Sequence, residues 1–354
     1  MRKLLPLIIL FCSLFVFSYS AYGNETGTVL SLEEAIKKAM QNSITLKNDQ
    51  VEIEKKDILF KDASSLIQYT PVDISFNPSD TNLFKYFYGA EYEKRKAEKK
   101  LENDRRQLII DVKSKYYNVI ASDKKLKALE LSEKKAQIQL LQAQAKYKVG
   151  LITKAELSAA EAKVATENAI LADAKAKLDN AYSEFNKAIG APLDSKPILK
   201  DLPIVEKKEL DINEQMNMAA SNSYEMWSAE EGARLTDRLK LFEKFYDIGD
   251  YNVDQAKNTL VDSRQEIKNQ TRKLCMSINY LYEKNNELEQ QISQYQEILK
   301  VAKVQWETGI ATRDTVLNAE YALQMAEASQ LEVASAYVTA LDTLSHLTGK
   351  EPNY

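Results

Sequence analysis

The chain has 354 residues, of which 28% are charged and 44% are hydrophobic, and its formal net charge is −4. This composition excludes a protein that passes repeatedly through a lipid bilayer, and the lack of a basic block argues against a nucleic-acid partner. With a single histidine, His346, and no phosphate-binding glycine loop, the sequence predicts neither enzymatic activity nor a metal or cofactor site.

The N-terminal residues 1–23 have the pattern of a secretory signal peptide. Arg2 and Lys3 precede an apolar run of 14 residues, and small and polar residues follow up to Gly23. The apolar run is shorter than the about 20 residues that a transmembrane helix needs, which favours cleavage over an uncleaved anchor. We therefore expect an exported protein whose mature chain keeps one cysteine, Cys275, and so has no internal disulfide.

The spacing of prolines and of hydrophobic residues predicts very long helices. No proline occurs from Ser79 to Ala191 or from Ile204 to Glu351. Proline-free runs rich in Ala, Glu, Lys and Leu form helices, and runs beyond about 25 residues are typical of coiled coils. A helix from Glu91 to Lys148 would be about 87 Å long at 1.5 Å per residue. The sequence therefore predicts a rod.

Heptad spacing continues in the segments that follow residues 153 and 312. A bulky residue recurs every seven positions with a small residue three positions further on, which lets two helices pack closely as knobs into holes. Glu167 in the first half and Gln330 in the second depart from this pattern. The bulky positions are Leu157, Val164, Leu171, Leu178 and Phe185 in the first half, and Val316, Leu323, Tyr337 and Leu344 in the second.

An internal repeat relates the two halves of the chain. Gly150 and Thr153 recur 159 positions later as Gly309 and Thr312. In each half the glycine is placed to end one helix with a positive φ, and the threonine is placed to cap the next helix. Each half therefore forms an antiparallel helical hairpin. We expect the tips of the two hairpins at about residues 149–153 and 308–312.

The first half contains an insert of 21 residues. Residues 31–43 match residues 211–223 at an offset of 180 rather than 159, so the extra residues lie between Asn42 and Tyr92. Because this stretch holds two prolines and many aromatic residues, we expect a short β-hairpin or loop at about residues 64–89. Aromatic rings gather at membrane–water interfaces, and packing of the rings against the helices is the alternative. The candidates for membrane contact are Tyr69, Phe76, Phe84, Tyr86, Phe87 and Tyr88.

The sequence thus predicts an all-α protein made of long antiparallel coiled-coil hairpins in two tandem repeats. We expect the first repeat at residues 24–190 and the second at 211–354. A proline-containing linker at 191–210 joins them. Strands should make up less than about a tenth of the chain, far below the usual share of a globular protein.

These features resemble the outer-membrane efflux channel family, the TolC-like proteins. The resemblance rests on the duplicated aromatic-x-x-Gly-x-x-Thr pattern, the alanine-rich heptads that follow it, and the glycine that ends each repeat. Residues 31–43, SLEEAIKKAMQNS, also resemble the opening segment of that family. The resemblance implies a homotrimer in which each chain contributes two hairpins to the α-helical tunnel of an efflux or type I secretion system.

The resemblance also implies roles for residues at and near the tips. The tips would meet a periplasmic adaptor that links the channel to an inner-membrane pump. Glu156 stands where the first hairpin often has an acidic residue at the narrow end of the tunnel, whereas Thr315 and Asn318 replace aspartates often found in the second hairpin. A strong cation-selecting ring is therefore not expected. The adaptor-contact residues are Val149, Gly150, Leu151, Thr153, Thr308, Gly309, Ile310 and Thr312.

Membrane attachment and transport are the points that the resemblance leaves open. Family members contribute β-strands to the outer membrane, but residues 242–251 are too short to hold two spanning strands of about 9–11 residues each. The resemblance implies an exported protein of the cell envelope, at the outer membrane or in the periplasm. The short segment leaves two alternatives: the protein docks to the membrane without a full span, or it works in an envelope that has no outer membrane. The alternative to a channel is a structural or adhesive helical rod of the envelope, which would remain a monomer where a channel forms a discrete trimer.

Overall fold

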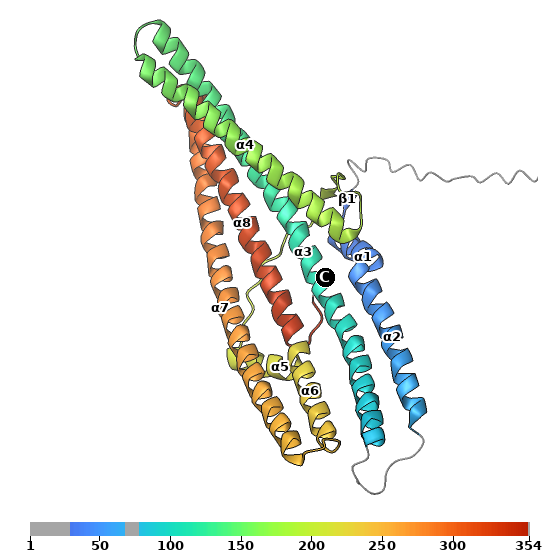
Figure 1. Ribbon diagram of the computed structural model, residues 1–354. Helices are drawn as coiled ribbons and strands as arrows, with labels where there is room; N and C mark the ends of the chain where they lie inside the picture. The colour runs from blue at the N-terminus through green and yellow to red at the C-terminus, as the bar shows by residue number, and fades with distance from the viewer. Residues whose placement is uncertain (1–28, 68–77, 353–354) are drawn as a thin grey trace, which may run out of the picture.

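The computed structural model describes residues 29–67 and 78–352. The signal peptide, together with Tyr69 and Phe76 of the insert, lies outside the described residues. Within them, no helix is both long enough and apolar enough to cross a membrane. The elements, labelled as in Figure 1, are β1 (Val29–Leu30), α1 (Leu32–Asn42), α2 (Ile44–Leu66), α3 (Pro78–Lys148), α4 (Lys154–Ile189), β2 (Ile198–Leu199), α5 (Ile212–Asn222), α6 (Tyr224–Lys240), α7 (Tyr246–Glu307) and α8 (Arg313–Leu347). The all-α fold with two long helical hairpins is confirmed.

Two long helices, α3 and α7, run through both ends of the molecule (Figure 1). In the half of the molecule that carries the hairpin tips, α3 packs against both α4 and α8, and α8 also packs against α7. In the other half, α2 packs on α3, α6 packs on α7, and α3 contacts α6. Each half is therefore a layer four helices wide, in the order α4, α3, α8, α7 near the tips and α2, α3, α6, α7 at the other end.

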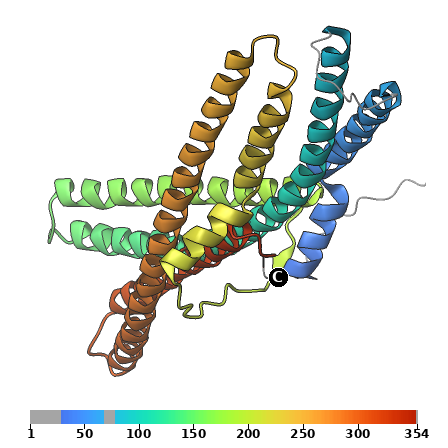
Figure 2. The ribbon, with the colours of Figure 1, turned by 90° about the horizontal axis from the view of Figure 1, so that it is seen from below.

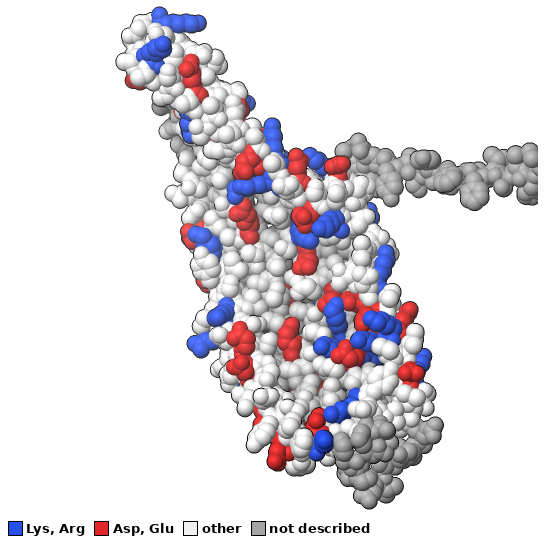
Figure 3. All heavy atoms as spheres, viewed as in Figure 1, with Lys and Arg blue, Asp and Glu red and all other residues white. Residues whose placement is uncertain are grey.

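The outline of the molecule is a rod whose hairpins diverge. Seen from below in Figure 2, the α3–α4 hairpin and the α7–α8 hairpin point in different directions, so their tips lie apart. On the face shown in Figure 3, acidic and basic side chains are interspersed rather than gathered by sign. Within a single chain, the two tips therefore form two separate ends.

The linker is fixed to the middle of the rod by two buried tyrosines. The hydroxyl of Tyr116 on α3 donates to the carbonyl of Leu30 at 3.0 Å and accepts from the backbone N–H of Lys200 at 3.1 Å. The hydroxyl of Tyr337 on α8 donates to the carbonyl of Glu206 at 2.5 Å. Strands β1 and β2 pair in parallel at this place. The short strands of the described residues thus lie where the N-terminal segment meets the linker.

The base of each hairpin, which is the end farthest from its tip, is held by the same kind of hydrogen bond. The side-chain amide of Asn42 donates to the carbonyl of Ile189 at 2.9 Å, and that of Asn222 donates to the carbonyl of Thr348 at 3.1 Å. A Cβ atom on Gly190 would lie only 2.5 Å from the Cβ atom of Asn42. Glycine is required here because the helix end and the asparagine approach so closely.

The two polar residues that interrupt the heptads have partners. Glu167 is buried, and its carboxylate lies 2.5 Å from the ammonium group of Lys163, which holds the pKa of Glu167 below its usual value. The amide of Gln330 donates to the side-chain oxygen of the buried Asn285 on α7 at 2.9 Å. The bond between Gln330 and Asn285 crosses from α8 to α7 and disfavours other registers, because a shift would leave the side-chain oxygen of the buried Asn285 without this donor.

The insert differs from the expectation. We expected a loop or β-hairpin over residues 64–89, but α2 continues to Leu66 and α3 already begins at Pro78. Proline fits the first position of a helix, where its missing N–H is not needed. Compared with the second repeat, α2 has 23 residues against 17 in α6 and α3 has 71 against 62 in α7. The insert therefore mainly lengthens two helices, and the rest of it lengthens the connection between them.

Candidate functional site: the hairpin tips

The first tip is a tight turn that begins where α3 ends. Gly150 adopts φ 76°, and its N–H donates to the carbonyl of Tyr147 at 3.0 Å. The N–H of Leu151 donates to the carbonyl of Lys146 at 2.9 Å. These two bonds satisfy carbonyls that the end of a helix leaves without partners, and the left-handed glycine makes them possible.

A reciprocal cap begins α4 directly after this turn. The hydroxyl oxygen of Thr153 accepts from the N–H of Glu156 at 3.2 Å, and the carboxylate of Glu156 accepts from the N–H of Thr153 at 2.7 Å. The hydrogen bond from this backbone N–H, followed by that from the Thr153 hydroxyl, holds the pKa of Glu156 below its usual value. The predicted capping role of Thr153 is thus present, and Glu156 has a structural role that the sequence analysis did not assign.

The second tip has the same turn and a weaker start to its helix. Gly309 adopts φ 74°, and its N–H donates to the carbonyl of Trp306 at 3.0 Å. Thr312 precedes α8 but makes no side-chain hydrogen bond to the backbone of the first turn. Its hydroxyl instead lies 3.2 Å from that of Thr315, which stands where the first tip has Glu156. The structure thus places all eight predicted contact residues at or beside the two turns.

Large apolar side chains project from both turns. Val149 is 70% exposed, Leu151 74% and Ile310 78%. A hydrophobic side chain at the end of a rod has no core to stabilise, so its exposure is typical of a contact surface. Contact of these residues with an adaptor stays a prediction.

The candidates for a constriction lie in the first turns after the tips. Glu156 is exposed on α4, and Thr315 and Asn318 are exposed on α8. Because the hairpin ends diverge in Figure 2, one chain does not bring these residues together. A ring made of them requires further copies of the chain, so their role in a constriction stays a prediction.

The helices at the two edges of the layer carry small and apolar residues that the sequence analysis did not recognise. On α7, Ile298, Val301 and Val304 are 45–55% exposed. On α4, alanines recur every seven positions on a face that is not the α3-facing seam, a signal that is visible in the sequence. These exposed alanines are Ala155, Ala162, Ala169 and Ala176.

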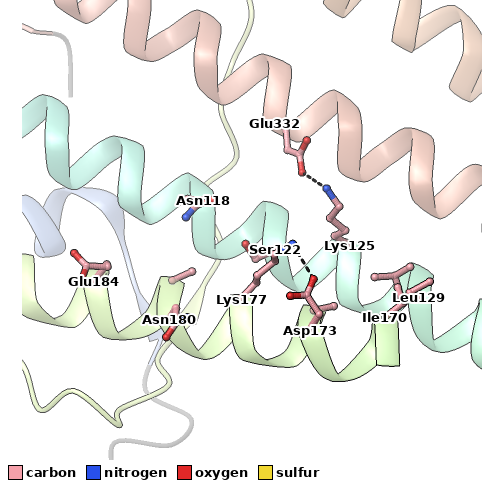
Figure 4. A pocket seen from close by; sticks show the side chains of 12 residues that line it. Asn118, Ser122, Lys125, Leu129, Ile170, Asp173, Lys177, Asn180, Glu184 and Glu332 are labelled. Atoms are coloured by element: carbon pink, nitrogen blue, oxygen red, sulfur yellow. Dashed lines mark hydrogen bonds and ion pairs between the residues drawn. The ribbon is translucent and has the colours of Figure 1, made fainter. Parts of the chain in front are cut away.

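A groove of about 540 Å³ lies between α3, α4 and α8 (Figure 4). The ammonium group of Lys125 lies 3.0 Å from the carboxylate of Glu332, and that of Lys177 lies 2.8 Å from the carboxylate of Asp173. These two ion pairs neutralise both lysines that line the groove. The half-exposed Ile170 adds apolar surface to the groove.

The described aromatic residues of the insert mostly pack inside the protein. Phe84 is 9% exposed, and its ring stacks on that of Phe242 with the centroids 5.3 Å apart. Tyr86 is 39% exposed and donates to the carboxylate of Asp62 at 3.1 Å. Further ring contacts join Tyr88 to Phe242 and Phe87 to Phe60. These contacts favour the packing alternative at this end of the rod, and membrane contact by the insert stays a prediction.

The sequence model of one protein family matches most of the chain. The family is described as outer membrane efflux protein, and the match covers residues 86–191 and 211–350, which include both hairpins. No curated protein sequence matches the chain.

Solved structures of bacterial outer-membrane channels share the fold. The CmeC outer membrane channel of Campylobacter jejuni aligns with a TM-score of 0.61 at 14% identity, covering 91% of this chain and 87% of that chain. The outer membrane protein VceC of Vibrio cholerae gives 0.59 at 13%, covering 91% and 97%. The open state of the MtrE outer membrane channel of Neisseria gonorrhoeae gives 0.57 at 13%, covering 91% and 89%.

Proposed function

Because the chain belongs to the outer membrane efflux protein family, we propose that it assembles as a homotrimer into a closed α-helical tunnel and docks an adaptor of a membrane pump at its hairpin tips. Membership of this family makes the chain an efflux channel protein of the outer membrane or cell envelope, exported from the cytoplasm. The assembly of the tunnel and the docking of the adaptor are the proposal.

The open edges of the helix layer carry this proposal. Near the tips α3 and α8 are each covered on two sides, whereas α4 and α7 stand at the edges. Neighbouring helices in the layer run in opposite directions, and α7 runs toward the tips while α4 runs away from them. An α7 edge placed against the α4 edge of a second copy would continue this alternation. The exposed alanines on α4 would let the apolar residues of α7 approach closely.

Repeating this contact closes a ring in which every edge is covered. A head-to-tail contact between identical chains gives a closed ring when its rotation matches the number of copies, and the resemblance implies three. Closure would also gather the hairpin ends of all copies at one mouth, where the exposed Val149, Leu151 and Ile310 form an apolar rim. Such a rim fits a protein partner such as an adaptor.

Cross-linking between the two edges tests the closure. Ala159 on α4 and Val301 on α7 are both exposed and lie at similar distances along the chain from the glycines of their tips. In a Cys275→Ala background, the double variant Ala159→Cys/Val301→Cys should give covalent dimers and trimers with a short bis-maleimide. Each single-cysteine variant should stay uncross-linked. Mass photometry of the unmodified protein should show a discrete trimer.

A protein that stays a monomer at micromolar concentration, with no cross-linking between the edges, would contradict the tunnel and favour the helical rod.

Adaptor docking has its own test. Leu151→Asp should abolish co-purification with the cognate adaptor and leave the melting temperature unchanged within a few degrees. Leu141→Asp is the matched control. Leu141 is 65% exposed on α3 below the tip, so this variant should bind the adaptor as the unmodified protein does.

A further inference from the structure

The two hairpin tips carry different charges. Around Gly150, residues 136–160 contain three lysines and one glutamate, a net charge of +2. Around Gly309, the equivalent residues 295–319 contain three basic and three acidic residues and are neutral. Basic side chains are visible at the end of the first hairpin, which is the uppermost part of Figure 3. We call the three lysines of the first tip, all of them exposed, the tip lysines: Lys146, Lys148 and Lys154.

The tip lysines have no acidic partner inside the protein. Within the part of the chain that the structure describes, none of them forms an ion pair. The nearby carboxylate of Glu156 is directed elsewhere, since it accepts from the N–H of Thr153 at 2.7 Å and from its hydroxyl at 2.9 Å. The positive charge of the first tip is therefore free to act on a partner.

The basic groups of the second tip have partners within the chain. The guanidinium carbon of Arg313 lies 5.3 Å from the centroid of the Trp306 ring. The ammonium group of Lys303 lies 3.8 Å from the carboxylate of Glu320. In addition, an exposed acidic residue, Glu307, stands where the first tip has a lysine. The two tips thus share a turn and differ in the charge that they present.

Helix stability does not account for all of the tip lysines. Lys146 and Lys148 lie in the last turn of α3, where a positive charge interacts favourably with the helix dipole. Lys154 is the first residue of α4, where a positive charge is unfavourable. Arg313 begins α8 in the same way but lies over the Trp306 ring, and Lys154 has no such ring among the described residues. Its charge therefore favours a contact outside the chain.

We propose that the first tip selects its partner by charge, and that the tip lysines bind carboxylates on an adaptor whose contact surface is acidic. These ion pairs would surround the apolar contact made by the exposed Val149 and Leu151. Complementary charges at an interface raise the association rate and exclude partners of the wrong sign. The neutral second tip would bind through Ile310 without this selection. The selection rests on the adaptor docking proposed above and adds to it the chemistry of the docked surface.

A protein is favoured over an anionic membrane as the partner of the tip lysines. Both tips lie in the same half of the rod (Figure 1), so a membrane surface that met one would meet the other. The exposed Glu307 of the second tip would then be repelled by the negative lipid headgroups. A protein can instead present a different surface to each tip.

Binding kinetics with the adaptor test the selection. The probe is the protein that co-purifies with the unmodified chain and is lost in Leu151→Asp. Lys148→Glu/Lys154→Glu should lower the association rate constant by more than about tenfold at low salt. Added salt should slow the unmodified protein toward the rate of this variant, because salt screens exposed charges.

Two controls separate charge from structure. Lys148→Arg/Lys154→Arg keeps both charges, and Lys134→Glu reverses the charge of an exposed lysine farther from the tip on α3, so both should bind at the unmodified rate. The Lys148→Glu/Lys154→Glu variant should keep its melting temperature within a few degrees. Glutamate is already the residue at the equivalent of position 148 in the second tip, and an acidic residue is favourable in the first turn of α4.

A zero-length carbodiimide gives a second readout, because it should join Lys148 or Lys154 to an aspartate or glutamate of the bound adaptor, as mapped by mass spectrometry. The selection alone is overturned if Leu151→Asp abolishes binding while Lys148→Glu/Lys154→Glu binds at the unmodified rate, or if salt leaves the association rate unchanged. It is also overturned if vesicles that contain phosphatidylglycerol bind the unmodified protein and not this variant, since a membrane would then be the partner. If no protein meets the definition of the probe, adaptor docking itself fails and the selection fails with it.

Discussion

The first hairpin, α3–α4, and the second hairpin, α7–α8, share one kind of turn and differ in what supports it. Gly150 and Gly309 have nearly the same φ, at 76° and 74°. The first tip adds a reciprocal cap between Thr153 and Glu156, and the second tip has none. The first residue of α4 that is buried is Glu167, more than three turns from the start of the helix, whereas α8 already buries residues in its first turn. The first tip thus depends on local hydrogen bonds and the second on packing.

This difference comes from the place of each helix in the layer. Leu157 and Val316 occupy equivalent heptad positions, yet Leu157 is half-buried and Val316 is 6% exposed. Helix α8 packs between α7 and α3, whereas α4 packs against only one long helix, α3. A buried ion pair of 2.5 Å between Lys113 and Asp342 also joins α3 to α8, with each side chain 5% exposed.

Breaking this ion pair should have the largest effect on stability. Asp342→Asn removes the negative charge that lies 2.5 Å from the buried ammonium group of Lys113, and we expect a loss of about 3–5 kcal/mol in the free energy of unfolding, measured with denaturant. Ser183 occupies the equivalent position of the first hairpin, and Ser183→Ala should change stability by less than about 0.5 kcal/mol. The double variant Lys113→Met/Asp342→Leu should recover most of the loss. Equal losses of unfolding free energy in Asp342→Asn and Ser183→Ala would contradict the conclusion that α8 lies in the interior of the layer.

A comparison of the tip with the base of the first hairpin should give the next largest effect. Gly150 and Gly190 have similar positive φ, so alanine at either position should cost about 1–2 kcal/mol from backbone strain. At Gly190 the new Cβ atom also meets Asn42 at 2.5 Å, and overpacking of this kind adds about 1–3 kcal/mol. Gly150 has open space around it. Denaturant unfolding of Gly150→Ala and Gly190→Ala should therefore differ, and equal losses would show that the base relaxes around the new methyl group.

Some of these features could be predicted from the sequence because they depend on local chemistry. Proline spacing and heptads determine the helices, and a glycine with a following threonine determines each tip. The burial of Val316 could not be predicted, because it depends on which hairpin lies in the interior of the layer. The exposure of Phe245 could not be predicted either, because it depends on how the turn between α6 and α7 packs through Phe242 against the distant Phe84.

The caps of the two tips should differ by a smaller amount. Thr153→Ala removes one side of a reciprocal cap and should cost about 1 kcal/mol, whereas Thr312→Ala removes a hydroxyl that does not cap the backbone and should cost only about a few tenths. Hydrogen exchange of the tip amides is the suitable measurement, because local opening at the end of a rod need not change global unfolding. Equal loss of protection at both tips would contradict a special role of the cap.

The smallest expected effect is a dependence on pH that is greater at the first tip than at the second. Hydrogen bonds from Thr153 lower the pKa of Glu156 in the folded state below its usual value of 4.5. A carboxyl group with a depressed pKa stabilises the fold above its unfolded pKa, and this contribution is lost as the pH falls through the folded value. Protection of the first-tip amides, corrected for the intrinsic exchange rate, should therefore decline as the pH falls below about 4.5. The second tip has the non-titrating Thr315 at this position and should change less. Glu156→Gln keeps a hydrogen-bonding side chain without a titratable carboxyl group, so it should remove the difference between the tips, and a decline that persists in this variant would assign the effect to another group.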